Sequence, residues 1–182
     1  MRKIFLFITA IAVVAPVAIS ATSEPSSEAA LLPAATISQA VKAMPANAAV
    51  DQPLRTVDGG MANVGIFVVH RPQEPDQGCT IEHDTLVNDK TTSIFLVLDG
   101  ASTLVTGGKL ADPAPLSSAD PDLKLVGSGS RGSGIKNGQS RRMSKGDVVI
   151  IPAGVPHGFS AIEKSITYEV VRVDSGKTLP VK

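Results

Sequence analysis

Histidine is the side chain in this sequence best suited to metal binding or proton transfer, and the chain has three: His70, His83 and His157. A neutral imidazole binds divalent ions and exchanges protons near neutral pH. The only cysteine is Cys79, so the chain has neither an internal disulfide nor a cysteine-based zinc site. The hydroxyl side chains form no recognisable Ser-His-Asp set, which leaves nucleophilic catalysis without support. Any chemistry therefore depends on how the histidines are placed.

His157 follows a short apolar run and a tight turn. Residues 148–151 read Val-Val-Ile-Ile, which favours a strand, and Gly146 suits a turn with positive φ before it. A proline ends the strand, Gly154 permits a second bend, and Pro156 stiffens the approach to the histidine. We expect this unit to point the imidazole into a cavity. The alternative is a histidine that only hydrogen-bonds a neighbouring carbonyl.

The order and spacing of Gly146, Pro152, Gly154 and His157 resemble the second sequence motif of the cupin family. The motif's closing asparagine is replaced here by Ala161. The resemblance implies an all-β fold, an antiparallel double-stranded β-helix or jelly-roll barrel. It does not name a substrate, because cupin barrels include enzymes, binding proteins and storage proteins.

The first cupin motif is present in degraded form. Residues 94–100 match its end, and counting back from the last of them places the family's glutamate at Ser93. If His83 is the first family histidine, the second falls on Thr85. By this resemblance the ligand-binding residues are His157, His83, Ser93 and Thr85, and the metal ligands are His157 and His83.

A metal site built on this reduced set would be weak. Two imidazoles supply no negative charge to a divalent ion. Glu82 and Asp84 flank His83, but strand alternation points them to the opposite face. Glu169 lies in the last expected strand, and alternation alone does not decide whether its face or that of Tyr168 lines the barrel. A divalent iron, manganese, zinc or nickel ion is therefore one alternative, and a metal-free barrel is the other.

The N-terminal sequence predicts export. Residues 1–21 combine Arg2 and Lys3 with an uncharged, mostly apolar run that ends in small residues, the pattern of a secretory signal peptide. An uncleaved membrane anchor is the alternative, because the run approaches the length that spans a bilayer. The mature protein is expected to be periplasmic or secreted, with no membrane contact after cleavage.

The remaining chain has the length of about one domain. Residues 22–53 are rich in Ala, Ser and Pro and are expected to form a linker, with a short helix around Ile37 and Val41. The barrel domain is expected over residues 54–176, and residues 177–182 form a polar tail.

Apolar and β-branched runs separated by turn residues predict the strands. These runs cover residues 64–69, 80–86, 93–98, 102–106, 148–151 and 162–173. His70 is expected at a loop edge after the first of them. Gly100 follows an aspartate in a hairpin signal, and Asn137-Gly138 predicts a second hairpin over residues 133–143. Residues 109–134 are rich in Pro, Gly, Ser and Asp and predict a lid or a disordered loop.

Charge patterning limits the partners. The chain has 17 basic and 17 acidic residues and no basic stripe of the kind that nucleic-acid binding needs. Arg141, Arg142 and Arg172 fall in strands and are expected on the solvated face, unless one points inward and binds an anionic ligand. Cupins often dimerise, so the resemblance implies a homodimer that would cover the apolar outer strands.

Three functions remain. The first is an exported cupin that binds a small molecule in its barrel, with weak metal binding or none. The second is a metal-dependent oxygenase or isomerase for a small organic acid or sugar, in which His157 and His83 hold the ion. The third is a structural or interaction protein whose barrel is filled by side chains. Loss of the glutamate speaks against the second, and the complete turn before His157 speaks mildly against the third, so we favour the first.

Overall fold

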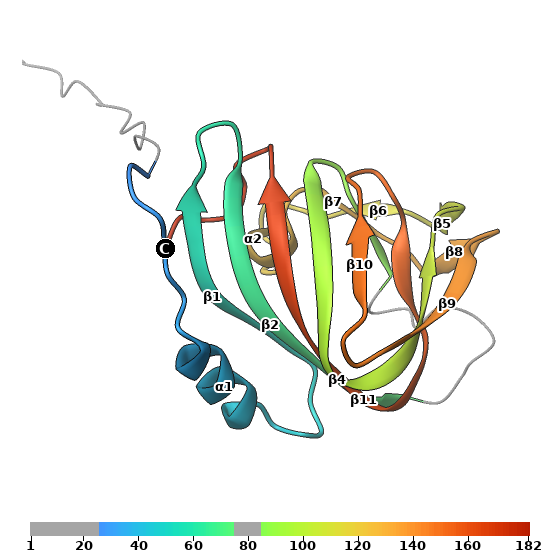
Figure 1. The fold of residues 1–182 in the computed structure, drawn as a ribbon. Coiled ribbons are helices and arrows are strands. Elements are labelled where there is room, and N and C mark those ends of the chain that lie inside the picture. The colour runs from blue at the N-terminus through green and yellow to red at the C-terminus, as the bar shows by residue number, and fades with distance from the viewer. Residues whose placement is uncertain (1–25, 75–84) are drawn as a thin grey trace, which may run out of the picture.

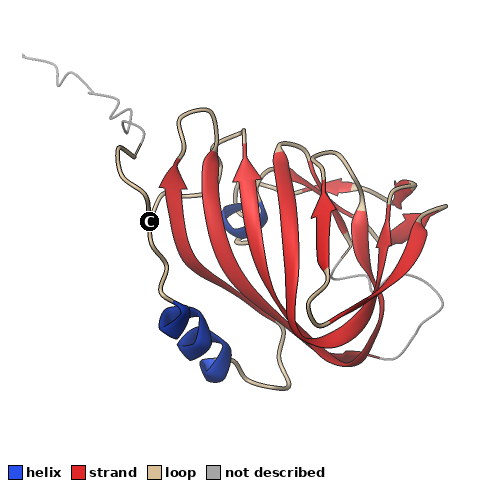
Figure 2. Ribbon diagram, viewed as in Figure 1, coloured by secondary structure: helices blue, strands red, loops and turns tan. Residues whose placement is uncertain are grey.

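The computed structural model describes residues 26–74 and 85–182 of the chain (Figure 1). The predicted signal peptide at residues 1–21, Cys79 and His83 lie outside these residues. In the described part the protein is built almost entirely of antiparallel strands, with two short helices (Figure 2). The predicted all-β class is therefore confirmed.

The elements follow one another along the chain in this order: α1 (Ala34–Ala43), β1 (Val50–Asp58), β2 (Asn63–Glu74), β3 (Leu86–Asn88), β4 (Thr91–Thr106), β5 (Lys109–Ala111), β6 (Ala114–Pro115), α2 (Leu123–Val126), β7 (Gly129–Arg131), β8 (Gly134–Lys136), β9 (Gln139–Ser144), β10 (Val148–Ile151) and β11 (His157–Asp174).

Two long strands, β4 and β11, hold the barrel together. They pair with each other along nearly their whole length, from His157 opposite Thr106 to Asp174 opposite Thr91. Each then pairs with different neighbours along its two halves. The first half of β4 pairs with β10 and its second half with β9, while β11 pairs with β3 at His157 and with β2 from Ile162 onward. The two strands therefore run through both walls of a curved, antiparallel double-stranded barrel (Figure 1).

Gly100 lies where β4 bends between its two halves. Its φ is +86°, and a Cβ atom at this position would lie 1.9 Å from the carbonyl oxygen of Ser165 on β11. Only glycine fits so close an approach. The predicted hairpin at Asp99-Gly100 is therefore wrong, because the glycine allows one strand to bend across its partner and does not reverse the chain.

The core lies between the two walls. It is formed by inward-facing aliphatic and aromatic side chains from β2, β4, β9, β10 and β11, together with a residue of the C-terminal segment. These are Phe67, Val69, Phe95, Val97, Leu104, Met143, Ile151, Phe159, Ile162, Ile166, Tyr168, Val170 and Leu179. Alternation along β11 sends Tyr168 and Val170 inward, so Glu169 faces outward, where it pairs with Leu96 of β4.

The N-terminal part of the barrel differs from the sequence prediction. β1 begins at Val50, within the predicted linker, and β2 continues through Glu74. His70 is therefore a strand residue and not a loop-edge histidine. It is 7% exposed, and its Nδ1 lies 2.9 Å from the Thr167 hydroxyl of β11. The longer strands carry Asp51 and Arg71 into the barrel wall, which matters for the site.

The segment 109–134 contains regular structure and is not a structureless loop. It holds β5, β6, α2 and β7, and β7 pairs with β3 of the barrel. The predicted hairpin over residues 133–143 is also wrong. β8 pairs with β5 and β9 pairs with β4, so Asn137, with φ of 59°, turns the chain between two different sheets.

The predicted polar tail at residues 177–182 is partly incorporated in the domain. Leu179 is fully buried, and its amide donates a hydrogen bond to the Asp174 carboxylate at 2.8 Å. The backbone of Lys182 pairs with that of Thr56 in β1. Neither helix in the described part of the chain is long and apolar enough to cross a membrane. On the outer face, Val148 and Ile150 of β10 are 59% and 64% exposed.

Candidate ligand-binding site

The turn that leads to His157 is fixed on both sides by backbone hydrogen bonds. Gly154 has φ of +81°, as the sequence predicts for a tight bend, and its amide donates to the Asn88 carbonyl at 2.7 Å. The amide of Gly107 donates to the Pro156 carbonyl at 2.9 Å. The imidazole at the start of β11 therefore has a rigid support.

The imidazole of His157 is neutral and oriented by its own turn. Its Nδ1 lies 3.0 Å from the Val155 carbonyl, which can only accept, so Nδ1 carries the hydrogen and Nε2 the lone pair. Burial lowers the pKa of His157 from 6.5 to about 4, and the nearby charge of Arg172 acts in the same direction. None of the described residues makes a hydrogen bond to Nε2. This nitrogen can therefore accept a hydrogen bond from a ligand or coordinate an ion.

His157 lines a small inner cavity of about 40 Å³. Its polar lining includes Ser93, Asn88 and Arg172, and Phe95 and Tyr168 form much of its apolar wall. The space is enough for a water molecule or a single ion and too small for an organic ligand.

A larger outer cavity of about 330 Å³ lies next to the inner one. It falls at the lower end of the range of small-molecule pockets. Its lining consists of Ala49, Asp51, Arg71, Leu86, Asp122, Leu125, Val126 and Arg131. Four of these residues, Asp51, Arg71, Leu86 and Val126, also line the inner cavity, so the two spaces adjoin. The outer cavity is where an organic molecule fits.

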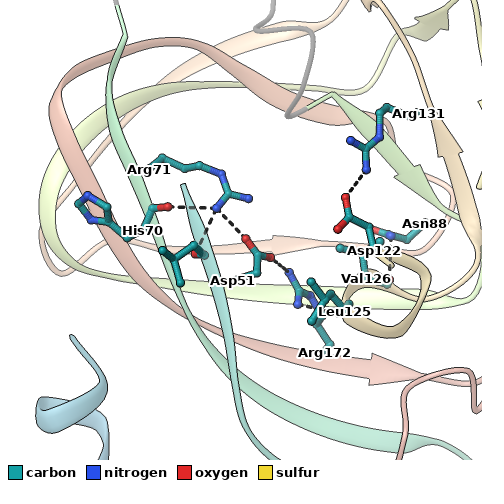
Figure 3. A network of polar contacts seen from close by, with 10 residues as sticks. Asp51, His70, Arg71, Asn88, Asp122, Leu125, Val126, Arg131 and Arg172 are labelled. Atoms are coloured by element: carbon teal, nitrogen blue, oxygen red, sulfur yellow. Dashed lines mark hydrogen bonds and ion pairs between the residues drawn. The ribbon is translucent and has the colours of Figure 1, made fainter. Parts of the chain in front are cut away.

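Asp51 of β1 lines both cavities and joins Arg71 and Arg172 (Figure 3). One carboxylate oxygen lies 2.6 Å from Nη1 of Arg71, and the other lies 3.1 Å from Nη2 of Arg172. Burial alone would raise the pKa of Asp51, but the two guanidinium groups outweigh it and hold the pKa below its ordinary value. Arg172 also stacks over the Phe67 ring, with its guanidinium carbon 4.4 Å from the ring centroid. All three groups are therefore charged and held in place at neutral pH.

The 109–134 segment forms one wall of the outer cavity through α2. Arg172 donates a hydrogen bond to the Leu125 carbonyl at 2.7 Å, and Asn88 donates to the Val126 carbonyl at 2.9 Å. Arg131 of β7 forms an ion pair with Asp122, the residue before α2 (Figure 3). Barrel side chains thus satisfy two carbonyls at the end of α2 and fix this short helix beside the cavity.

The structure brings together some of the predicted ligand-binding residues. Ser93 and His157 line the same inner cavity. Thr85 is fully buried next to β3 but lines neither cavity. His83 lies outside the described residues.

The described residues do not fit the divalent ion that the cupin resemblance implies. Ser93, the position that the cupin resemblance assigns to the family's glutamate, lines the cavity with His157, and its hydroxyl brings no negative charge to an ion. The nearest cavity carboxylate, Asp51, is already bound by two guanidinium groups. Across residues 26–74 and 85–182, no three His, Cys, Asp or Glu side chains are grouped so that they could hold a metal ion.

Several cavity residues were not recognised from the sequence. Asp51 fell in the predicted linker, and Arg71 came after the predicted end of its strand. Arg172 was left open between a solvated and an inward position, and it points inward with 5% exposure. It alternates in phase with Tyr168 and Val170, but the sequence did not decide whether that face or the face of Glu169 points inward. Arg131 had no signal, because nothing in the sequence predicted β7.

Comparisons with solved structures find cupin-like barrels at low sequence identity. The iron(II) form of HppE aligns with a TM-score of 0.46 and 14% identity over 68% of this chain and 50% of that one. An RmlC-like cupin from Methanocaldococcus jannaschii aligns with a TM-score of 0.41 and 12% identity, covering 71% and 84% of the two chains. The cupin domain of Schizosaccharomyces pombe Cnp3 gives 0.45 and 11%, covering 74% and 71%.

This chain thus matches only about half the length of the HppE structure. No family model and no curated protein matches the sequence significantly. The similarity concerns the fold alone. Two long strands shared by both walls of an antiparallel barrel, and the strand-turn unit that ends in His157, show that the chain has a cupin fold.

Proposed function

We propose that this protein is an exported cupin-domain protein that binds a small organic molecule in the outer cavity of its barrel. The observation that carries the proposal is the outer cavity itself, about 330 Å³ in volume and lined by charged side chains and an apolar wall. A mostly apolar wall with a few polar groups at fixed positions is typical of small-molecule pockets. Export rests on the N-terminal sequence, which reads as a signal peptide.

The two competing functions have less support. The core side chains fill most of the space between the two walls and leave about 40 Å³ beside His157. Support for a ligand site therefore comes from the outer cavity beside β1, β3 and α2, which a purely structural barrel would not require. A metal-dependent enzyme is favoured by the orientation of His157, whose hydrogen-bonded Nδ1 leaves Nε2 available as it is in metal-binding histidines. However, Ser93 beside it is uncharged, and Arg172 carries a positive charge that repels a metal ion. Metal binding there would therefore be weak.

A fragment screen tests the proposal. Ligand-observed NMR of the full chain would identify small molecules that bind, and the same screen would be repeated on Leu125→Trp, which places a larger side chain in the outer cavity. Leu31→Trp is the matched control, because Leu31 is 87% exposed and does not line the cavity.

We expect compounds that bind the parent protein and Leu31→Trp but not Leu125→Trp. The melting temperature of each variant checks that the fold is kept. A screen in which no compound distinguishes Leu125→Trp from the control would contradict the proposal.

A further inference from the structure

The charged side chains that line the two cavities include three arginines and two aspartates. The arginines are Arg71, Arg131 and Arg172, and the aspartates are Asp51 and Asp122. Guanidinium groups recognise carboxylates through paired, planar hydrogen bonds. Whether a ligand's carboxylate can bind one of these guanidinium groups depends on how strongly the protein's own carboxylates and carbonyls already bind it.

Arg172 and Arg71 are held firmly. Their side chains are 6% and 14% exposed, and both are bound to the Asp51 carboxylate. Each also donates to backbone carbonyls, Arg172 to Leu125 at 2.7 Å and Arg71 to His70 at 3.1 Å. These contacts fix the two guanidinium groups as part of the cavity wall, and a ligand would not displace them.

Arg131 is different. Its side chain is 32% exposed, and that of its partner Asp122 is 38% exposed. A solvent-accessible ion pair of this kind adds little to stability, so a second carboxylate can replace Asp122 at small cost. Arg131 is therefore the guanidinium group in the outer cavity that is best placed to accept an acidic ligand.

The rest of the outer cavity fits an apolar body. Ala49, Leu86, Leu125 and Val126 supply its apolar lining. A molecule that places an acidic group on Arg131 can lay its carbon skeleton against these side chains.

We infer that the outer cavity recognises small organic acids, whose carboxylate binds Arg131 in exchange for Asp122 while an apolar body contacts Leu86, Leu125 and Val126. This inference rests on the proposed function and specifies its ligand class. Asp122 acts as an internal competitor for the ligand's acid group.

The test uses benzoate and benzamide, which have the same size and shape and differ in charge. Dissociation constants would be measured by NMR titration on the full chain. Because a solvent-accessible ion pair contributes little and Asp122 competes for Arg131, we expect benzoate to bind a few-fold more tightly than benzamide.

Arg131→Gln should abolish that preference, and Asp122→Asn should tighten benzoate binding severalfold by removing the competing carboxylate. Arg141→Gln is the matched control, because Arg141 is on β9, is exposed, and lines neither cavity. It should bind both compounds as the parent does. The gain expected in Asp122→Asn cannot result from damage to the fold.

The outcomes separate this inference from the function it rests on. Equal binding of benzoate and benzamide, no binding of either, or an unchanged preference in Arg131→Gln would overturn the acid class. If neutral fragments still bound the parent and not Leu125→Trp, the proposed function would stand. If no compound distinguished those two proteins, the proposed function would fail.

Discussion

Protonation of His157 should weaken the fold as the pH falls. The imidazole is 7% exposed, and its pKa is lowered by burial from 6.5 to about 4. Between these two pH values the unfolded chain binds a proton that the folded chain does not. Stability contributed by the neutral histidine is therefore complete above about pH 6.5 and is lost as the pH approaches 4.

The difference between the two pKa values sets the size of the effect. A difference of 1 between the pKa values of the unfolded and folded states is equivalent to about 1.4 kcal/mol. The free energy of unfolding should therefore fall by about 3 kcal/mol as the pH decreases to 4, from this group alone. Other groups titrate in the same range, and carboxylates are the main ones. A comparison with His157→Gln removes their contribution, because they are common to both proteins.

The assay is urea unfolding of both proteins at several pH values between 7.5 and 4. We expect the stability difference between the parent and His157→Gln to shrink by about 3 kcal/mol over this interval. The same comparison with His70→Gln controls for a histidine outside the cavities. A difference that stayed constant with pH would refute the placement of His157 as a buried, neutral imidazole.

The remaining predictions test the barrel, the network and the metal hypothesis. Gly100→Ala should cost about 3 kcal/mol or more in thermal unfolding, because its Cβ would lie 1.9 Å from the Ser165 carbonyl; a cost near zero would contradict the tight crossing. Asp51→Asn should cost about 3 kcal/mol by urea unfolding, because it leaves two guanidinium groups in the wall without their shared carboxylate; an unchanged midpoint would contradict that. Ser93→Glu should raise the affinity for zinc or manganese in equilibrium dialysis, and unchanged affinity would mean that Ser93 is not the family's glutamate position. The homodimer stays a prediction. If the exposed Ile150 of β10 lies in its interface, Ile150→Lys should halve the particle mass measured by sedimentation velocity, and a monomeric parent protein would refute the dimer.

The fold was predictable from the sequence because its signals are local. The strand-turn unit before His157 shows its glycines and prolines at fixed spacing, and Gly154 adopts the positive φ that the spacing requires. The long strands were harder to predict. Asp99-Gly100 is a turn signal in the sequence. In the structure Gly100 instead lies within a continuous strand, which bends there because the glycine passes close to the Ser165 carbonyl.

The site was less predictable because it depends on contacts between distant segments. Asp51 and Arg172 are far apart in the sequence and meet only when β1 and β11 flank β2. The polar composition of residues 109–134 suggested a loop. The hydrogen bonds from Arg172 and Asn88 that hold α2 beside the cavity come from outside this segment, so its composition does not reveal them. The cupin resemblance predicts a site at His157, which lines the small cavity, whereas the ligand-sized cavity lies beside it.

Native mass spectrometry of the untagged protein, purified from its own source, would show whether the barrel carries a small organic molecule. We expect an adduct with the mass of such a molecule, absent from Leu125→Trp and retained in Leu31→Trp, and no stoichiometric metal. One iron, manganese, zinc or nickel ion per chain in place of the adduct, lost in His157→Ala, would refute the proposed function and support a metal-dependent enzyme.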